Sequence, residues 1–262
     1  MIRNHKMVGA VSVPSPNFTN REITPRFIVM HYTAGWEVQS ALDTFRNPAS
    51  QVSAQITIDT DGVVYQHVPF NLRAWHAGPS RFAGFSDLNS HSIGIEFVNP
   101  GFLRKAKGGY TDAYSRFVSE DHAPLLVEAS NARAGSGTFY WPVYTNAQLE
   151  AGERLVKELI DAYPIMDIVS HEEIDTRGWK TDPGPAFPMN RFRALLRDRR
   201  GDVVNYEVTA SSLNVRSGPG TNFPVVGSLY NGDTVVALDT RGDWVKVTSD
   251  HWVHAGYLRR SA

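Results

Sequence analysis

The sequence predicts an α/β sheet domain over residues 1–200, followed by a small all-β barrel over residues 203–262. Two observations support the first assignment: short apolar runs typical of buried strands, and segments with helical spacing that alternate with them along the chain. The third observation is a change of character at Gly201-Asp202. Beyond it helical spacing is absent, and short alternating segments are separated by closely spaced turns.

The bulk composition is that of a globular protein. The 262 residues are 42% hydrophobic and 20% charged, which allows a sizeable core. A net charge of −1 argues against nucleic acid as the main partner, because binding it normally needs a basic face. The chain has no cysteine, so any metal must be bound by histidines and carboxylates. The first 18 residues contain no long apolar run, so we expect neither a signal peptide nor a membrane span.

The first half of the large domain reads as strands with one helix. Residues 1–24 are polar and predict an irregular lead-in, and residues 71–89 read as a loop rich in small residues. Asp61-Gly62 is a hairpin signal between two alternating segments. The expected elements are a strand at residues 27–31, a helix at 36–46, a hairpin of strands at 52–59 and 63–67, and a strand at 92–98.

The second half is organised around one clear helix. Thr145 and Gln148 form a capping box at its start, and Pro164 stops it. Before it lies a long insertion, residues 100–144, which we expect to wall one side of a substrate cleft, because loops of this length are usually functional or mobile. The expected elements are a short helix near residues 113–121, the capped helix at 145–163, a strand at 166–171 and a final amphipathic helix at 188–200.

Two strands that end in histidine, together with one aspartate in a proline-bounded loop, indicate a metal site. His31 ends the first strand, His171 ends the strand at 166–171, and Asp182 follows in the stretch SHEEIDTRGWKTDPGP. Zinc binds imidazole nitrogen and carboxylate oxygen, and catalytic zinc sites use three protein ligands and leave one position for water. Because most histidines are ordinary surface or core residues, this set is meaningful only through the motifs that lie in order with it.

Two further charged residues have an ordinary and a catalytic interpretation. Glu96 lies in the apolar run Ile-Gly-Ile-Glu-Phe-Val, where it is either an outward-facing strand residue or a general base whose pKa an apolar environment raises. Lys180 taken alone is a surface lysine, but it lies only two residues before Asp182. That position favours a role beside the metal.

The order and spacing of these motifs resemble the zinc-dependent N-acetylmuramoyl-L-alanine amidases of the type 2 class, which share a fold with peptidoglycan recognition proteins. The resemblance covers most of residues 27–190 and is carried by IVMHYTA, VSAQITIDTDGVVYQHV, AWHAG, NSHSIGIEFVN and IVSHEEI followed by KTDPGPAF. It implies a mixed central sheet flanked by helices. It also implies zinc as cofactor, with the ligands His31, His171 and Asp182, and with Glu96 and Lys180 as catalytic residues.

The same resemblance points to a substrate-binding segment around AWHAG. It places His76 in the cleft, with Trp75 and Arg73 beside it. Arg73 or Arg81 could pair with a carboxylate of the stem peptide, although the sequence favours solvated surface residues for both. Many relatives have histidine where this chain has Gln55, so the cleft chemistry is expected to differ there.

The second domain resembles bacterial SH3-like domains over residues 205–260, through SLNVRSGPGTNFPVVGSL, NGDTVV, GDWVKV and HWVHAGYL. Such domains commonly bind cell-wall peptide or glycan. The alternating apolar residues, among them Val225, are expected to form the barrel core. The candidates for a wall-binding face are Tyr206, Tyr230, Trp252 and Tyr257.

The expected function is hydrolysis of the amide between N-acetylmuramic acid and L-alanine of the stem peptide, in the periplasm or outside the cell. The expected partner is peptidoglycan, bound by a monomer. The alternatives are a recognition protein that binds without cutting, a cytoplasmic amidase that recycles muropeptides, and an interaction protein that binds proline-rich peptides. A phage endolysin, a housekeeping enzyme and a delivered antibacterial effector with an immunity protein remain open as biological settings.

Overall fold

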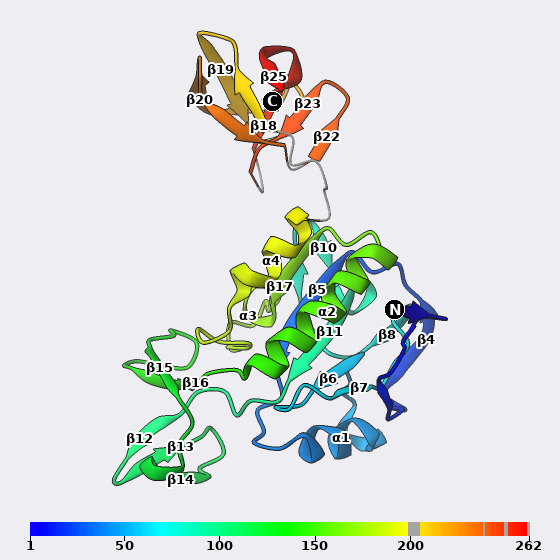
Figure 1. Cartoon of the computed structure of the whole chain (residues 1–262), viewed down its shortest axis with the longest axis vertical. Helices are drawn as coiled ribbons and strands as arrows, with labels where there is room; N and C mark the ends of the chain where they lie inside the picture. Colours follow the sequence, from blue (N-terminus) through cyan, green and yellow to red (C-terminus); the bar gives the residue numbers. More distant parts are fainter. Residues whose placement is uncertain (199–204, 238, 249–250, 261–262) are drawn as a thin grey trace. The chain divides into compact units, whose positions relative to one another are not determined.

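The computed structural model describes residues 1–198, 205–237, 239–248 and 251–260. The chain divides into two compact units, Met1–Leu196 and Arg197–Ala262 (Figure 1). The predicted change of domain at Gly201-Asp202, and the predicted start of the second domain at residue 203, lie outside the described residues. In the part of the chain that the structure describes, no helix is both long and apolar enough to cross a lipid bilayer.

The first unit is built on a six-stranded mixed sheet with the order β17-β5-β11-β6-β7-β3. The first four strands in that order run parallel, β7 is antiparallel to β6, and β3 pairs in parallel with β7. The expected α/β class with a mixed sheet is confirmed. The strands are β3 (Val11–Ser12), β5 (Phe27–Tyr32), β6 (Ile56–Ile58), β7 (Val64–Gln66), β11 (Ser92–Phe97) and β17 (Asp167–Ser170).

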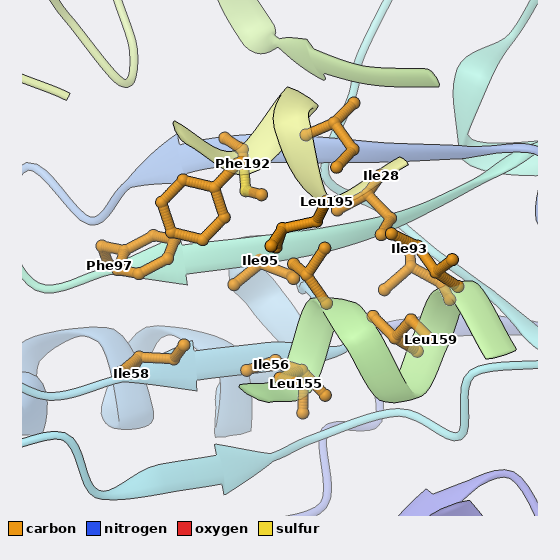
Figure 2. Close-up of a cluster of buried hydrophobic side chains, with 14 of the residues drawn as sticks. Ile28, Ile56, Ile58, Ile93, Ile95, Phe97, Leu155, Leu159, Phe192 and Leu195 are labelled. Atoms are coloured by element: carbon orange, nitrogen blue, oxygen red, sulfur yellow. The ribbon is translucent and has the colours of Figure 1, made fainter. Parts of the chain in front are cut away.

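One face of the sheet carries the main hydrophobic core. Helices α2 (Asn146–Ala162) and α4 (Met189–Asp198) cover this face, and Figure 2 shows Leu155, Leu159 and Phe192 packed against isoleucines of the sheet. Each fully buried side chain of this kind contributes about 1.5–3 kcal/mol. The capping box predicted for α2 is confirmed: Thr145 Oγ1 accepts from the Gln148 backbone, and Gln148 Oε1 accepts from the Thr145 backbone.

The alternation of β5 and β11 decides which residues reach the opposite face. Ile28 and Met30 of β5 lie in the main core, whereas Phe27 and Val29 belong to a smaller cluster behind the sheet. Because successive side chains of a strand point to opposite faces, the next residue, His31, points to the side of the smaller cluster. Ile95 and Phe97 lie in the main core by the same rule, so Glu96 points to the same side as His31.

Several predictions for the polar segments are wrong. The lead-in at residues 1–24 forms short strands, and β4 (Phe18–Glu22) pairs with β8 (Leu72–Ala74) inside the expected loop at residues 71–89. These strands bury little apolar surface, so they lack the hydrophobic alternation that marks a strand in sequence. The other short strands in these segments are β1 (Ile2–Arg3), β2 (Lys6–Met7), β9 (Arg81–Phe82) and β10 (Phe85–Ser86).

The insertion at residues 100–144 is formed mainly by strands, and in place of the short helix expected near residues 113–121 it has the strand β14 and a single 3-10 turn, Glu120–His122. The side chain of Asp112 accepts from the backbone N–H groups of Tyr114 and Arg116 at 2.9 Å each, which folds a turn where a helix was expected. The strands of the insertion are β12 (Arg104–Ala106), β13 (Gly109–Thr111), β14 (Phe117–Ser119), β15 (Leu126–Ala129) and β16 (Phe139–Pro142).

The remaining helices agree with expectation except at one histidine. Helix α1 (Val38–Arg46) occupies the segment predicted at 36–46. The strand predicted at 166–171 stops at Ser170, and His171 instead begins the four-residue helix α3 (His171–Ile174). Ser170 caps that helix through a capping box with Glu173, which fixes the direction in which the chain leaves the sheet.

The second unit is all-β, in a three-stranded and a five-stranded sheet. Its core contains Leu213, Val215 and Val253, whereas Val225, expected inside, is 49% exposed. The strands are β18 (Asn205–Val208), β19 (Ser212–Arg216), β20 (Val225–Tyr230), β21 (Thr234–Val236), β22 (Asp239–Arg241), β23 (Trp244–Lys246), β24 (Trp252–His254) and β25 (Leu258–Arg260).

The four aromatic candidates for a wall-binding face differ in exposure. Tyr230 is 60% exposed and Tyr257 is 51% exposed, and Tyr206 is half-buried. Trp252 is only 5% exposed and packs beneath the cationic ends of neighbouring side chains. Its assignment to an exposed face is therefore wrong, because a buried indole has too little free surface to contact a ligand.

Candidate metal centre

Three strands deliver the candidate residues to one edge of the central sheet. His31 lies near the carboxyl end of β5, and Glu96 pairs with it in register on the neighbouring strand β11. His171 directly follows β17, which runs parallel on the other side of β5. The carboxyl ends of parallel strands meet at the same edge of a sheet, which is where open α/β sheets place their binding sites.

The three predicted metal ligands meet atom to atom. His31 Nδ1 lies 3.0 Å from His171 Nδ1 and 2.9 Å from Asp182 Oδ2. His171 Nδ1 lies 2.9 Å from the same carboxylate oxygen. All three side chains are buried, and together they form a group that could hold a metal ion.

The contact on the far side of His171 indicates which ring nitrogen carries the proton. His171 Nε2 lies 3.2 Å from the carbonyl oxygen of Ala77. A carbonyl oxygen can only accept, so Nε2 must donate. In the neutral ring, Nδ1 therefore keeps its lone pair, and that lone pair faces Asp182.

A chain of hydrogen bonds leads to the same assignment for His31. Ser92 Oγ donates to the Leu88 carbonyl at 2.5 Å, so it accepts from His76 Nε2 at 3.3 Å. His76 Nδ1 is then an acceptor, and His31 Nε2 donates to it at 3.0 Å. His31 Nδ1 is left with a lone pair that faces the other two ligand atoms. His76 thus orients a ligand from behind, a role that the sequence motifs did not indicate.

The electrostatics of the group agree with these assignments. Burial, followed by the nearby His171, lowers the pKa of His31 to about 4, so this ring is neutral at neutral pH. Burial alone would raise the pKa of Asp182, but the two imidazoles that contact it outweigh that effect and hold its pKa below the usual range. The ligand-facing nitrogens of His31 and His171 and a carboxylate oxygen of Asp182 thus face one another, an arrangement of donor atoms that suits a divalent cation such as zinc.

Glu96 lies beside this group with one oxygen unsatisfied. Its Oε2 is buried and has no hydrogen-bond partner among the described residues. Buried polar atoms without a partner are rare in folded proteins. Burial, followed by the charge of Asp182, raises the pKa of Glu96 well above its usual value, against the opposing effect of Lys180. A carboxyl group in this environment is suited to taking up and returning a proton.

A buried carboxylate that the motifs did not single out holds the loop that carries Lys180 and Asp182. Asp175 accepts from Arg177 Nε at 2.9 Å and from the backbone N–H groups of Trp179 at 3.1 Å and Lys180 at 3.3 Å. Burial opposes the charge on Asp175, but these hydrogen bonds lower its pKa to about 2, so it is ionised. The path of the loop therefore depends on this one side chain.

The insertion at residues 100–144 is tied to the loop that carries Asp182 and to the loop that follows β5. Arg133 Nη1 donates to the backbone carbonyl of Lys180 at 3.3 Å. At the other end of the insertion, Asp112 Oδ2 accepts from Trp36 Nε1 at 2.9 Å, in the loop that follows β5. No periodic pattern marks these contacts in the sequence, because each joins irregular segments far apart in the chain.

Two cavities open beside the metal group. The larger one, about 820 Å³, is lined by the three ligands and Glu96, and the smaller one is about 390 Å³. Trp75, His76, Trp179 and Lys180 line both cavities. The residues of the insertion that line the larger cavity are Pro100, Phe102, Ala113 and Tyr114.

The residues predicted to bind substrate fall into different places. Trp75 lies at the junction of the two cavities, and His76 reaches both while holding His31. Arg73 lines the smaller cavity and donates to Asp87 Oδ1 at 2.8 Å, so its guanidinium is not a free surface cation.

Gln55, which stands where many relatives have histidine, uses its side chain to connect two strands. Gln55 is fully buried, its Oε1 accepts from the Gly94 backbone at 2.8 Å, and its Nε2 donates to the Leu72 carbonyl at 3.1 Å. The expected change in cleft chemistry at this position is wrong in the described structure, because the amide is used to join β11 to β8.

Similarity to known proteins agrees with this geometry. The chain is 30% identical over 211 residues to the 1,6-anhydro-N-acetylmuramyl-L-alanine amidase AmpD of Escherichia coli (strain K12), which covers 72% of this chain and 93% of the relative. It is also 30% identical over 176 residues to the N-acetylmuramoyl-L-alanine amidase AmiD of the same strain, covering 64% of this chain and 51% of AmiD.

Two solved structures of amidases are also similar to this chain. A crystal structure of an AmpD derivative superposes with a TM-score of 0.52 at 29% identity, over 74% of this chain and 98% of that one. The complex of Escherichia coli AmiD with anhydro-N-acetylmuramic acid-L-Ala-D-gamma-Glu-L-Lys gives a TM-score of 0.50 at 28% identity, over 68% of this chain and 59% of that one.

The family profiles divide the chain in two. The bacterial SH3 domain profile matches residues 211–259. The profile described as N-acetylmuramoyl-L-alanine amidase matches residues 20–185, which include all three candidate metal ligands, Glu96 and Lys180. From its metal group, its fold and these similarities, the chain belongs to the N-acetylmuramoyl-L-alanine amidase family.

Proposed function

We propose that this chain is a zinc-dependent hydrolase that cleaves the amide between N-acetylmuramic acid and L-alanine of peptidoglycan. Membership of the amidase family supports the reaction. The meeting of His31 Nδ1, His171 Nδ1 and Asp182 Oδ2 supports the metal. Two imidazole nitrogens and one carboxylate oxygen are donor types that zinc binds, so His31, His171 and Asp182 would hold the ion.

The chain's own residues divide the work of the reaction. Zinc held by the three ligands supplies Lewis acidity to the attacking water and to the scissile carbonyl. Glu96 accepts the proton of that water and returns it to the leaving amine of L-alanine. Lys180 offers positive charge to the oxygen that becomes negative during the attack, where the loss of one donor typically costs about 10²–10³ in rate.

The observation that carries this proposal is the unpaired oxygen of Glu96 beside three atoms that offer lone pairs. A purely structural cluster would satisfy that oxygen with a donor, because leaving it buried and unpaired destabilises the fold. A site that receives a water molecule and a substrate can leave it free. Peptidoglycan binding without hydrolysis would require none of this arrangement.

The decisive experiment separates turnover from metal binding. Glu96→Gln should lower the rate of muropeptide cleavage by about 10²–10⁴ while the protein retains its zinc. His31→Ala should lose both zinc and activity. Metal content by elemental analysis and product release by chromatography measure the two effects. A Glu96→Gln protein that cleaves at the normal rate would exclude the proposed base.

We propose that the second unit holds the enzyme on the polymeric cell wall. The match to a bacterial SH3 domain supports this, and the exposed rings of Tyr230 and Tyr257 are the remaining aromatic candidates for contact. Replacing both by alanine should reduce cosedimentation with purified cell walls and leave the cleavage of a small muropeptide unchanged. Lysis of intact cells to which the unmodified chain is added would place it among antibacterial or endolysin-type enzymes.

A second candidate function is the recycling of soluble anhydro-muropeptides. The names of several relatives, 1,6-anhydro-N-acetylmuramyl-L-alanine amidases, favour it. The ratio of kcat/KM on intact cell walls to kcat/KM on the anhydro-muropeptide distinguishes the two. A wall hydrolase should cleave both substrates, whereas a recycling enzyme should prefer the soluble one by orders of magnitude.

A further inference from the structure

Trp179 stands out as a large apolar side chain left open to solvent beside the catalytic group. Its residue is 63% exposed, it directly precedes Lys180, and it lines both cavities. An exposed apolar residue is by itself ordinary, since much of any protein surface is apolar. Two further observations distinguish Trp179: the guanidinium of Arg177 contacts its ring, and its backbone N–H is hydrogen-bonded to a buried carboxylate.

The support of the ring comes from Arg177. Its guanidinium carbon lies 4.6 Å from the centroid of the Trp179 ring, and its Nε donates to the buried carboxylate of Asp175 at 2.9 Å. Gly78 permits this placement, because a Cβ at that position would come within 2.9 Å of Arg177 Nη2. The guanidinium is therefore held between a carboxylate and an indole.

The backbone of Trp179 is held by the same carboxylate. Its N–H donates to Asp175 Oδ2 at 3.1 Å, and Asp175 is also approached by Arg133 Nη1 of the insertion at 3.8 Å. The indole is thus presented on a loop whose position is set by buried charge. Fixing an aromatic ring in advance removes much of the entropy that a ligand would otherwise lose on ordering it.

The covalent structure of the substrate brings a sugar ring close to the reacting carbon. The lactyl group that carries the scissile carbonyl is attached directly to the ring of muramic acid, so a sugar ring lies only a few bonds from the reacting carbon. Trp179 lies three residues before the ligand Asp182 and one before Lys180. A pyranose ring presents C–H groups on its flat faces, and aromatic rings bind such apolar faces while their edges stay in contact with water.

We propose that Trp179, supported by Arg177, is the stacking surface for an N-acetylated amino-sugar ring next to the scissile amide. This inference rests on the proposed function, because it takes the sugar to be the part of the substrate that adjoins the cleaved bond. It makes Trp179 the residue that distinguishes a muramoyl peptide from a free peptide of the same sequence. The cation beneath the ring strengthens the contact by fixing the plane of the indole.

The test uses binding, so it does not depend on turnover. The full chain carrying Glu96→Gln is titrated by calorimetry with N-acetylmuramoyl-L-alanyl-D-isoglutamine and, separately, with L-alanyl-D-isoglutamine. Adding Trp179→Ala should weaken binding of the sugar-bearing ligand by roughly tenfold, the usual size for truncating an aromatic anchor, and leave the peptide unchanged. Trp179→Phe should restore most of the loss, because it keeps a flat apolar face.

Phe117→Ala is the matched control. Phe117 is 58% exposed on β14 of the same unit and lines neither of the two cavities, so its removal should change nothing. Equal weakening of both ligands by Trp179→Ala would show that the ring contacts the peptide, and would overturn the inference. So would unchanged binding of the muramoyl ligand, or no binding of it by the Glu96→Gln chain. Failure of the proposed function would appear elsewhere, as absence of amide cleavage by the unmodified chain.

Discussion

At the scale of single residues, the ring nitrogens of two histidines decide the chemistry of the site. Both His31 and His171 direct Nδ1 at Asp182 and use Nε2 for a hydrogen bond behind the ring. Partners behind a ligating imidazole fix its tautomer and orientation, and their loss typically weakens metal binding 10–100-fold. The backbone carbonyl behind His171 cannot be removed by substitution, but the partner behind His31 can.

The first prediction therefore concerns His76. His76→Ala should weaken zinc binding by roughly 10–100-fold, because His31 loses the acceptor that holds its Nε2 proton. Competition with a chromophoric chelator measures the dissociation constant. The control is His122→Ala, which removes an exposed imidazole of the insertion. Unchanged zinc affinity in His76→Ala would show that His31 is oriented by packing alone.

The second prediction concerns the protonation of Glu96. A general base must be ionised, and burial raises the pKa of Glu96 well above its usual value. The rate should therefore fall as pH falls through this raised pKa, so the acid limb of the kcat/KM profile should lie above the ordinary glutamate value of about 4.3. Metal content is measured at each pH, because loss of zinc in acid would give a limb of the same sign. An acid limb at the ordinary value, with zinc retained, contradicts the assignment.

At the scale of elements, the segment from β17 to the loop before α4 is positioned by capping and by buried charge. The capping box at Ser170 sets the exit from the sheet, and Asp175 gathers the backbone that presents Lys180. Arg133 connects the same backbone to the insertion. The insertion thus acts on the site by holding a loop in place as well as by lining a cavity.

The third prediction tests Asp175 through stability. Asp175→Asn should lower the free energy of unfolding by about 1.5–3 kcal/mol at neutral pH, the usual range for hydrogen bonds to a charged group. The pKa of Asp175 is lowered from 3.8 to about 2 in the folded protein. Its contribution is therefore complete above about pH 4 and is lost as pH falls through about 2.

Denaturant unfolding of the variant and the unmodified chain, measured from about pH 5 down to the acid limit of the fold, checks this prediction. The stability difference should shrink as the solution becomes more acidic. Glu128→Gln, at an exposed position of β15, serves as the control, and its difference should not vary. A difference for Asp175→Asn that grows in acid would be inconsistent with an ionised, hydrogen-bonded carboxylate.

At the scale of the whole molecule, a metal ion would join segments that are distant in the chain. His31 is 140 residues from His171 and 151 from Asp182. A ligand that binds only the folded state adds about 2.7 kcal/mol at one hundred times its dissociation constant. Zinc should therefore raise the free energy of unfolding of the first unit, in addition to its role in the reaction.

The fourth prediction follows from this linkage. Chelation should lower the midpoint of thermal unfolding by roughly 5–10 °C, and added zinc should restore it. Differential scanning calorimetry measures the midpoint, and His31→Ala is the control, because its midpoint should be insensitive to zinc. A zinc-independent midpoint in the unmodified chain would mean that the three side chains do not bind the ion in the folded state.

The sequence by itself determined the fold class, the capped helix α2 and the identity of the residues that gather at the sheet edge. These follow from local patterns: apolar period, capping residues, and histidines placed where buried strands end. The shared face of His31 and Glu96 was not among them, because the strand before His31 is apolar at every position, and only the core clusters and the pairing of β5 with β11 show which way each side chain points.

Only the tertiary structure decided which ring nitrogens face one another, that His76 holds His31, that Asp175 organises the Lys180 loop, and that Trp179 stays exposed on a fixed support. It also decided that polar segments become short strands, most of them paired in two-stranded sheets. These features depend on hydrogen bonds and charges between irregular segments far apart in the chain. Such contacts have no period and no fixed spacing in the sequence. They can be recognised only once the order of the strands in the sheet has brought the segments together.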